Sequence, residues 1–385
     1  MRYFALDWFT HQFELSRGSK SNIRSMEGMR GAAVFMVFLV HYCTLVNPWI
    51  QKQSFTAAVA EGLHTIGNAG VDLFFVLSGY LIYGSLINRR QLFFSFIRRR
   101  IRRIYPTFLV VFGLYVALSF ALPAENKIPH APLAGIVYLL ENLLLLPGLL
   151  AIDPLITVAW SLSYEMFYYV TIPFLIAGFH LHTFSAEQRL KGFALVALGA
   201  FLSAFFFGGP IRLAMFLAGI LLYEALKVPS IKATRDGMTL GLVIGGLFFM
   251  LAPVYGSAGI AVKTALLFIA FFALCHNCFV HPTSRIAAAL QWTPLRWLGN
   301  MSYSYYLIHG LTLKAIFKFL SVLYPPGSNN QYLFLPFIVV AFAATLIPST
   351  VLFLTIERRF SLKTEKATLP VPEVQLSHSL GSSTR

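Results

Sequence analysis

The chain contains few charged residues. Asp, Glu, Lys and Arg make up 12% of its 385 residues, whereas soluble domains carry roughly 25%. Hydrophobic residues make up 57% of the chain, and a soluble core cannot bury that much apolar surface. Apolar stretches of about 20 residues, long enough to cross about 30 Å of hydrocarbon, recur between Val34 and Phe353. This composition excludes a soluble globular protein and predicts a chain that crosses a membrane many times.

Cysteine is also scarce. Cys43, Cys275 and Cys278 all stand in apolar surroundings, and the last two form a CxxC pair. A structural zinc site of this type needs a second pair of ligands, which the sequence lacks. We therefore predict three cysteines in the core of the protein and no metal site.

Acidic residues are half as numerous as basic ones, so the net charge is +15. The basic residues stand between the apolar stretches and at the two ends of the chain, instead of on one continuous polar face. This distribution is typical of residues that determine membrane topology. We therefore expect membrane lipid among the partners of the protein and no nucleic acid.

The apolar stretches predict an all-α, polytopic membrane protein with about ten transmembrane helices. The first 25 residues lack a short apolar core followed by a small-residue cleavage site, so we expect no cleaved signal peptide. Residues 87–105 contain seven arginines and no acid, which places them in the cytoplasm and the N-terminus with them. The predicted spans lie near 29–47, 64–86, 106–123, 160–178, 192–207, 211–226, 238–255, 261–280, 301–323 and 333–356.

A further apolar stretch, 135–150, poses a choice, because one more span would reverse every later loop. If this stretch is interfacial or re-entrant, the basic loops 227–237 and 281–300 fall in the cytoplasm, together with the end of the chain. We therefore predict ten spans with both termini cytoplasmic. The chain is predicted to consist of a cytoplasmic segment 1–25, a transmembrane domain 26–360 and a cytoplasmic tail 361–385. The tail is too polar to fold and is expected to be disordered.

Arg30 and His41 stand on the first predicted span. Eleven steps of about 100° return a helix to nearly the same face, so both side chains point the same way, about 16 Å apart. His41 then lies in the outer half of the bilayer, where an ionisable side chain is a functional candidate. The alternative is a histidine that only hydrogen-bonds a neighbouring helix, and the residue alone does not decide between the two.

Two acidic residues are expected near the depth of His41. Asp72 lies in GVDLFFVLSGY, just below the outer end of the second span, and Glu165 lies in WSLSYEMFYY, near the outer end of the fourth. A buried carboxylate needs a partner, and a histidine on the adjoining span could be that partner. We therefore predict a catalytic group of His41, Asp72 and Glu165 at one level. Within GVDLFFVLSGY, Ser78 and Gly79 are expected to permit close helix packing.

Five arginines precede the third span in FIRRRIRRIYP, which is more than a topology signal needs. They suit either anionic lipid or a phosphorylated cytoplasmic ligand, because guanidinium groups bind phosphate through two hydrogen bonds. His309, in SYSYYLIHG on the ninth span, is another ionisable residue near mid-depth. It could line a path between the arginines and the outer residues, or it could be a packing histidine.

These strings together resemble the membrane acyltransferase-3 family. The resemblance rests on EGMRG and VHY with the Arg30-to-His41 spacing, on GVDLFFVLSGY, RRRIRRIYP and WSLSYE, and on YSYYLIH followed by IERRF. The strings stand in the family's order and span roughly residues 24–360. Members acylate sugars of O-antigens, exopolysaccharides and related glycans, or other acceptors outside the cytoplasm.

The resemblance implies an O-acyltransferase of the inner membrane that takes an acyl group, by default acetyl, from cytoplasmic acyl-CoA. The acceptor would be a hydroxyl of a cell-surface or secreted polysaccharide, such as lipopolysaccharide, or of its lipid-linked precursor. His41, Asp72 and Glu165 would be catalytic, with His41 as general base or transient acyl carrier. The other implied site residues are Arg30, Arg99, Arg100, Arg102 and Arg103 for the CoA phosphates, and Trp160, Ser163 and His309 for the substrate.

The sequence also allows a transporter instead of an enzyme. A proton-coupled transporter or a flippase for lipid-linked sugars would also hold ionisable residues inside the bilayer. Such transporters are usually built from internal repeats with paired broken helices, and the two halves of this sequence show no convincing repeat. The sequence therefore favours the acyltransferase, and release of CoA from labelled acyl-CoA would separate the two classes.

Overall fold

The computed structural model describes residues 8, 10–15, 21–88, 91–327 and 331–362. Within these ranges every extended regular element is a helix, as predicted, and pairing of β type is limited to one isolated bridge between Pro147 and Leu150. The predicted disordered tail, from residue 363 onward, lies outside the described residues, as does most of the segment 1–25.

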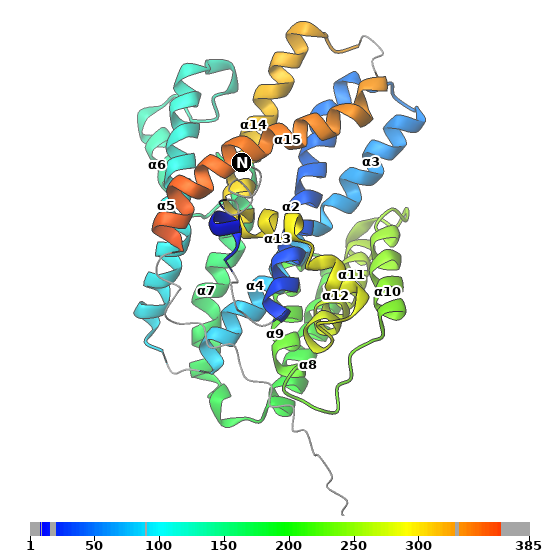
Figure 1. The fold of residues 1–385 in the computed structure, drawn as a ribbon. Helices are drawn as coiled ribbons and strands as arrows, with labels where there is room; N and C mark the ends of the chain where they lie inside the picture. The colour runs from blue at the N-terminus through cyan, green and yellow to red at the C-terminus, as the bar shows by residue number, and fades with distance from the viewer. Residues whose placement is uncertain (1–7, 9, 16–20, 89–90, 328–330, 363–385) are drawn as a thin grey trace, which may run out of the picture.

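The helices follow one another along the chain with short connections (Figure 1). The α-helices are α2 (Ser21–Val46), α3 (Phe55–Gly67), α4 (Ala69–Ile87), α5 (Phe93–Ala121), α6 (Pro132–Leu143), α7 (Trp160–Gly178), α8 (Ala186–Phe207), α9 (Ala214–Ala225), α10 (Asp236–Phe249), α11 (Gly256–Val280), α12 (Arg285–Leu290), α13 (Thr293–Asn300), α14 (Ser302–Leu323) and α15 (Phe334–Leu352). Two short 3-10 turns matter for the site, η3 (Thr157–Ala159) and η5 (Ile211–Leu213), and the π-helix η7 (Phe353–Ser361) continues α15.

Seven helical stretches of the described chain are long and apolar enough to cross a membrane, which supports a multi-pass membrane protein. They are Arg24–Trp49, Phe55–Ile87, Phe93–Ala121, Ala186–Phe207, Gly256–Val280, Ser302–Leu323 and Gln331–Ser361. The predicted number of ten is not confirmed, because α9 has 12 residues and α10 has 14. Helices of these lengths extend about 18 to 21 Å, less than the hydrocarbon thickness.

The apolar stretch 135–150 does not form a spanning helix. Only Pro132–Leu143 is α-helical, and these 12 residues extend about 18 Å. The chain then turns at Leu145, whose φ of 55° is left-handed, and at Gly148, whose φ is 95°. This segment therefore returns toward α7 without crossing the bundle, in agreement with the interfacial or re-entrant interpretation.

Helices α4 and α9 pack with their backbones almost in contact. A Cβ atom added to Gly79 would lie 2.1 Å from the carbonyl oxygen of Phe216, and one added to Gly219 would lie 2.0 Å from that of Val76. Both positions therefore require glycine, as small residues do where membrane helices cross closely. The predicted packing role is confirmed for Gly79, whereas Ser78 donates a hydrogen bond to Glu165. The glycine contact holds α4, which carries Asp72 and Ser78, against a fully buried helix.

The three cysteines are buried and unbridged, as predicted for core residues. In the described ranges, no group of three or more His, Cys, Asp or Glu side chains is placed to hold a metal ion.

The end of the described chain closes one side of the helix bundle. Figure 1 shows α15 crossing the bundle obliquely, with η7 ending beside α5. Arg103 of α5 and Glu357 of η7 form an ion pair there, with 3.1 Å between Nη1 and Oε1. This contact joins segments that are far apart in the sequence and places η7 beside the arginine-rich start of α5.

Candidate active site

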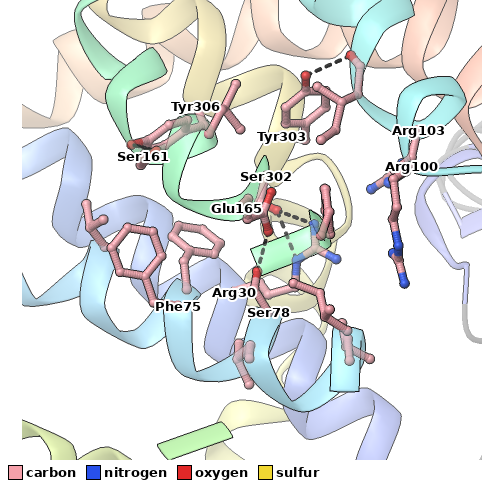
Figure 2. A pocket seen from close by; sticks show the side chains of 18 of the residues that line it. Arg30, Phe75, Ser78, Arg100, Arg103, Ser161, Glu165, Ser302, Tyr303 and Tyr306 are labelled. Carbon is pink, nitrogen blue, oxygen red and sulfur yellow. Dashed lines mark hydrogen bonds between the residues drawn. The ribbon is translucent and has the colours of Figure 1, made fainter. Parts of the chain in front are cut away.

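A cavity of about 270 Å³ lies between α2, α4, α5, α7 and α14 (Figure 2). We call it the arginine cavity, after the three arginines in its wall. Its polar lining residues are Arg30, Ser78, Arg100, Arg103, Ser161, Glu165, Tyr169, Ser302, Tyr303 and Tyr306. Four of these belong to the set predicted from the sequence, namely Arg30, Arg100, Arg103 and Glu165.

Arg30 is held in this cavity by Ser302 at the start of α14. Its Nε and Nη2 atoms both donate to Ser302 Oγ, at 3.2 and 2.9 Å. Figure 2 shows the guanidinium group between Ser302, Ser78 and Glu165. The side chain is only half-buried, so its positive charge faces the cavity space.

Glu165 lies at the level of Arg30, not at the level of His41. Its carboxylate accepts a hydrogen bond from Ser78 Oγ and lines the arginine cavity. Ser78 comes six residues after Asp72 on α4, which is about 9 Å along the helix axis. Asp72 follows Gly70, which packs against Ala33 and Met36 of α2, so Asp72 also lies several residues along α2 from the level of His41. The prediction that His41, Asp72 and Glu165 share one depth is therefore wrong. Hydropathy locates the ends of helices only to within several residues, and each residue shifts a side chain by about 1.5 Å.

Asp72 is paired with an arginine that the sequence analysis missed. The carboxylate is 2% exposed, and its Oδ1 lies 3.5 Å from Nε of Arg212 in η5. The guanidinium of Arg212 also lies over the ring of Trp160, 5.8 Å from its centroid. The predicted partner of Asp72 was His41, but the structure gives the carboxylate to Arg212 instead. A signal was available, since Arg212 is an isolated cation in an apolar stretch at the outer end of two predicted spans.

The arginines of α5 divide into two groups. Arg100 and Arg103 line the arginine cavity, where Arg100 stacks on Tyr169 with its Cζ 5.3 Å from the ring centroid. Arg99 instead donates to Gln91, and Arg102 is exposed outside the cavity. The sequence pattern therefore located the cluster, but only two of its four predicted members face the cavity.

Glu357 is the second residue that the sequence analysis missed. It is fully buried, and besides its ion pair with Arg103 it accepts hydrogen bonds from the backbone N–H and the Oγ of Ser304, at 3.0 and 2.6 Å. This carboxylate therefore fixes Arg103 relative to α14. The sequence contained a signal for Glu357, because this residue is the acid of the IERRF string; the string supported the family resemblance, but its glutamate was given no role.

A second cavity, of about 230 Å³, lies between the C-terminal parts of α2 and α5, the turn η3 and the middle of α14. We call it the histidine cavity, because His41 is in its wall; the other polar side chains that line it are Thr44, Tyr115, Thr157 and Lys314. His41 is half-buried, and its ring makes no hydrogen bond to any described residue. The imidazole is therefore free to meet a ligand in this space.

His309 lies directly behind His41, with 5.0 Å between the ring centroids. It is fully buried, and its Nδ1 lies 2.9 and 3.0 Å from the carbonyl oxygens of Tyr305 and Tyr306. Carbonyls only accept hydrogen bonds, so Nδ1 carries a proton and the free lone pair of the neutral ring is on Nε2. His309 lines neither of the two cavities, so the structure does not place it on a path between them; it is a buried packing histidine whose ring contacts that of His41.

The other two predicted substrate contacts have different surroundings. Ser163 is fully buried and donates to the carbonyl of Pro147, so it holds the loop before α7 in place. Trp160 packs edge to face with Phe75, at 6.2 Å between centroids, and under Arg212. Neither side chain is part of the wall of the two cavities described above.

The fold and the two cavities define a class: a multi-pass membrane protein with an arginine-lined and a histidine-lined space inside one helix bundle. The family described as an acyltransferase domain, acyltransferase-3, matches residues 23–354. The chain therefore belongs to this family, as the motifs predicted. The match includes all the predicted site residues, from Arg30 to His309, but ends before Glu357.

Two curated relatives carry names that describe an activity. The O-acetyltransferase OatA of Staphylococcus aureus is 28% identical over 352 residues, which cover 80% of this chain and 53% of the relative. YrhL of Bacillus subtilis, whose name proposes a peptidoglycan O-acetyltransferase, is 28% identical over 323 residues, covering 74% of this chain and 48% of the relative. The chain thus spans about half the length of these relatives. No solved structure matches it significantly.

Proposed function

We propose that this protein is a membrane O-acyltransferase that moves an acyl group, by default acetyl, from cytoplasmic acyl-CoA to a hydroxyl of a cell-envelope glycan or its lipid-linked precursor. The observation that carries the proposal is the pair of cavities in one bundle, one with three arginines and one with His41. The family match and the names of the relatives support acylation of an oxygen.

The arginine cavity suits the donor. CoA carries several phosphate charges, and guanidinium groups bind phosphate in a fixed, two-pronged geometry. Arg100 and Arg103 lie in the first half of α5, within the arginine-rich segment 87–105 that the positive-inside rule assigns to the cytoplasm. We propose that these two arginines bind the phosphates at the cytoplasmic mouth, while Arg30 lies deeper, beside the thioester end.

The histidine cavity suits the acceptor. Its lining comes from the ends of α2 and α5 that are distant from the arginines, and so from the outer side in the proposed topology. We propose that His41 takes the proton of an acceptor hydroxyl, whose oxygen attacks the thioester carbonyl. The C–S bond then breaks, and the leaving CoA thiolate takes up a proton. His309, through its free Nε2, would orient the ring of His41 or accept the proton from it.

A covalent route uses the same groups. His41 could first take the acyl group from the thioester and then pass it to the hydroxyl. Incubation with labelled acetyl-CoA without acceptor, followed by peptide mass spectrometry, separates the routes, because only the covalent route labels His41. A transporter is the second class, and the same incubation separates it from the acyltransferase, because a transporter would not release CoA.

The test uses the full chain in membrane vesicles with labelled acetyl-CoA. We expect CoA release together with label in the envelope glycans, and loss of both in His41→Ala. His276→Ala is the matched control, because His276 is a buried histidine of α11 that belongs to neither cavity wall. Glycan labelling by His41→Ala at the wild-type rate would refute the proposal.

A further inference from the structure

The two cavities meet at the side chain of Tyr306. Its hydroxyl donates to the carbonyl oxygen of Val158 at 3.2 Å and can accept from Ser161 Oγ at 2.8 Å; Ser161 Oγ itself lies 3.1 Å from the same carbonyl oxygen. Tyr306 and Ser161 line the arginine cavity, whereas Val158 lines the histidine cavity. This hydrogen-bonded group, which we call the tyrosine partition, therefore stands between the two spaces.

The partition is packed on both sides. The ring of Phe74 meets the ring of Tyr306 edge to face, with 6.1 Å between centroids, and the ring of His309 lies 6.2 Å away on the side of His41. Tyr306 is 7% exposed. A phenol ring in this position blocks the direct route between the cavities, and hydrogen bonds to a hydroxyl and a backbone carbonyl hold it there.

We propose that Tyr306, held by Ser161, is the residue that determines which acyl groups this enzyme transfers. The inference rests on the proposed function, in which the acyl group leaves a thioester in the arginine cavity and reaches an oxygen beside His41. In that reaction the acyl carbon crosses the partition. The room beside the phenol ring therefore sets the size of the acyl group, while the CoA moiety remains in the arginine cavity.

The chemistry of the partition suits a short acyl group. When the hydroxyl of Tyr306 leaves the carbonyl of Val158, it can donate the same hydrogen bond to the carbonyl of the incoming acyl group, so no buried donor is left without a partner. The methylene groups of a longer acyl chain gain no hydrogen bond, and they need additional space that only displacement of the Tyr306 ring can provide. Discrimination of one methylene in a closed apolar pocket is typically about 10- to 200-fold in rate.

The experiment measures transfer from acetyl-CoA, butyryl-CoA and hexanoyl-CoA by the full chain in membrane vesicles, with the vesicles' own envelope glycans as acceptors. We expect Tyr306→Ala to lower the preference for acetyl over butyryl by about tenfold or more, by widening the passage. Tyr168→Ala is the matched control, because Tyr168 is a buried tyrosine of α7 that lines neither cavity and donates to the carbonyl of Leu213 at 2.7 Å. Its chain-length preference should equal that of the wild type.

Two conservative variants keep the inference testable if Tyr306→Ala does not fold. Tyr306→Phe keeps the ring but loses both hydrogen bonds, and Ser161→Ala removes one of them. Both should release CoA without transferring the acyl group, because a loosened ring admits water to the thioester. The inference would be overturned if these variants kept the wild-type preference for acyl-chain length and the wild-type ratio of acyl transfer to CoA release. A wild-type protein that releases no CoA at all would instead overturn the proposed function.

Discussion

Replacement of Arg100 by alanine should weaken donor binding without unfolding the protein. Arg100 lines the arginine cavity, donates to Ser85 Oγ at 3.3 Å and stacks on Tyr169. It forms no ion pair with an acid of the described chain, so its charge is available to a phosphate. Loss of a hydrogen bond to a charged group costs about 1.5–3 kcal/mol, which corresponds to about 10- to 100-fold weaker binding.

The assay is equilibrium binding of labelled acetyl-CoA to the full chain in nanodiscs. Arg102→Ala is the matched control, because Arg102 belongs to the same run of arginines but is exposed outside the cavity. S-acetyl-pantetheine, which lacks the nucleotide and its phosphates, serves as the second ligand. Its affinity should be the same in wild type and Arg100→Ala, because the lost contact is to a phosphate.

Two results would refute the reasoning. Equal weakening by Arg102→Ala and Arg100→Ala would mean that the whole run attracts the donor by its summed charge, without a defined site. Equal weakening of acetyl-CoA and S-acetyl-pantetheine binding by Arg100→Ala would mean that the arginine shapes the cavity without touching phosphate. Binding at several ionic strengths separates these cases further, because attraction by summed surface charge is screened by salt.

Three further predictions concern the contacts that build the site. Glu357→Ala should destabilise the protein by about 3–5 kcal/mol, because it removes the buried carboxylate that pairs with Arg103. Thermal unfolding in detergent measures this loss, and a wild-type midpoint would contradict it. Arg212→Ala should lower the free energy of unfolding, because it leaves the charge of Asp72 buried without its arginine. Adding Asp72→Asn to the same chain should restore part of this stability. If the two substitutions instead lower stability additively, the two side chains do not form a stabilising pair. Gly219→Leu should prevent folding, since its Cβ would lie 2.0 Å from the carbonyl of Val76, and size-exclusion chromatography should show aggregates instead of a monodisperse peak.

Sequence reasoning identified the elements that depend on local pattern. Hydropathy and the run of arginines gave the multi-pass class and the position of the basic segment before the third span. The spacing of Arg30 and His41 follows from helix geometry, and both residues lie in cavity walls of the structure. Helical periodicity needs no information about neighbours, which explains this agreement.

The contacts that the sequence did not reveal all depend on how separate helices are placed against one another. Glu165 lies at the level of Arg30 and not at the expected level of His41, because an error of a few residues in a helix boundary moves a side chain by several ångströms. The partner of Asp72 comes from η5, and no local pattern links the two. Tyr306 stands among several aromatic residues in SYSYYLIHG, so nothing in the string distinguishes it as the partition.

The position of Glu357 near the end of the described chain has a consequence for biogenesis. Synthesis proceeds from the N-terminus, so Arg103 is inserted long before the carboxylate that pairs with it exists. During most of translation this guanidinium lacks the carboxylate of Glu357. A ribosome-bound chain that ends before η7 should therefore have an arginine cavity that is open on the side of η7, and the ion pair between Arg103 and Glu357 closes that side when η7 arrives.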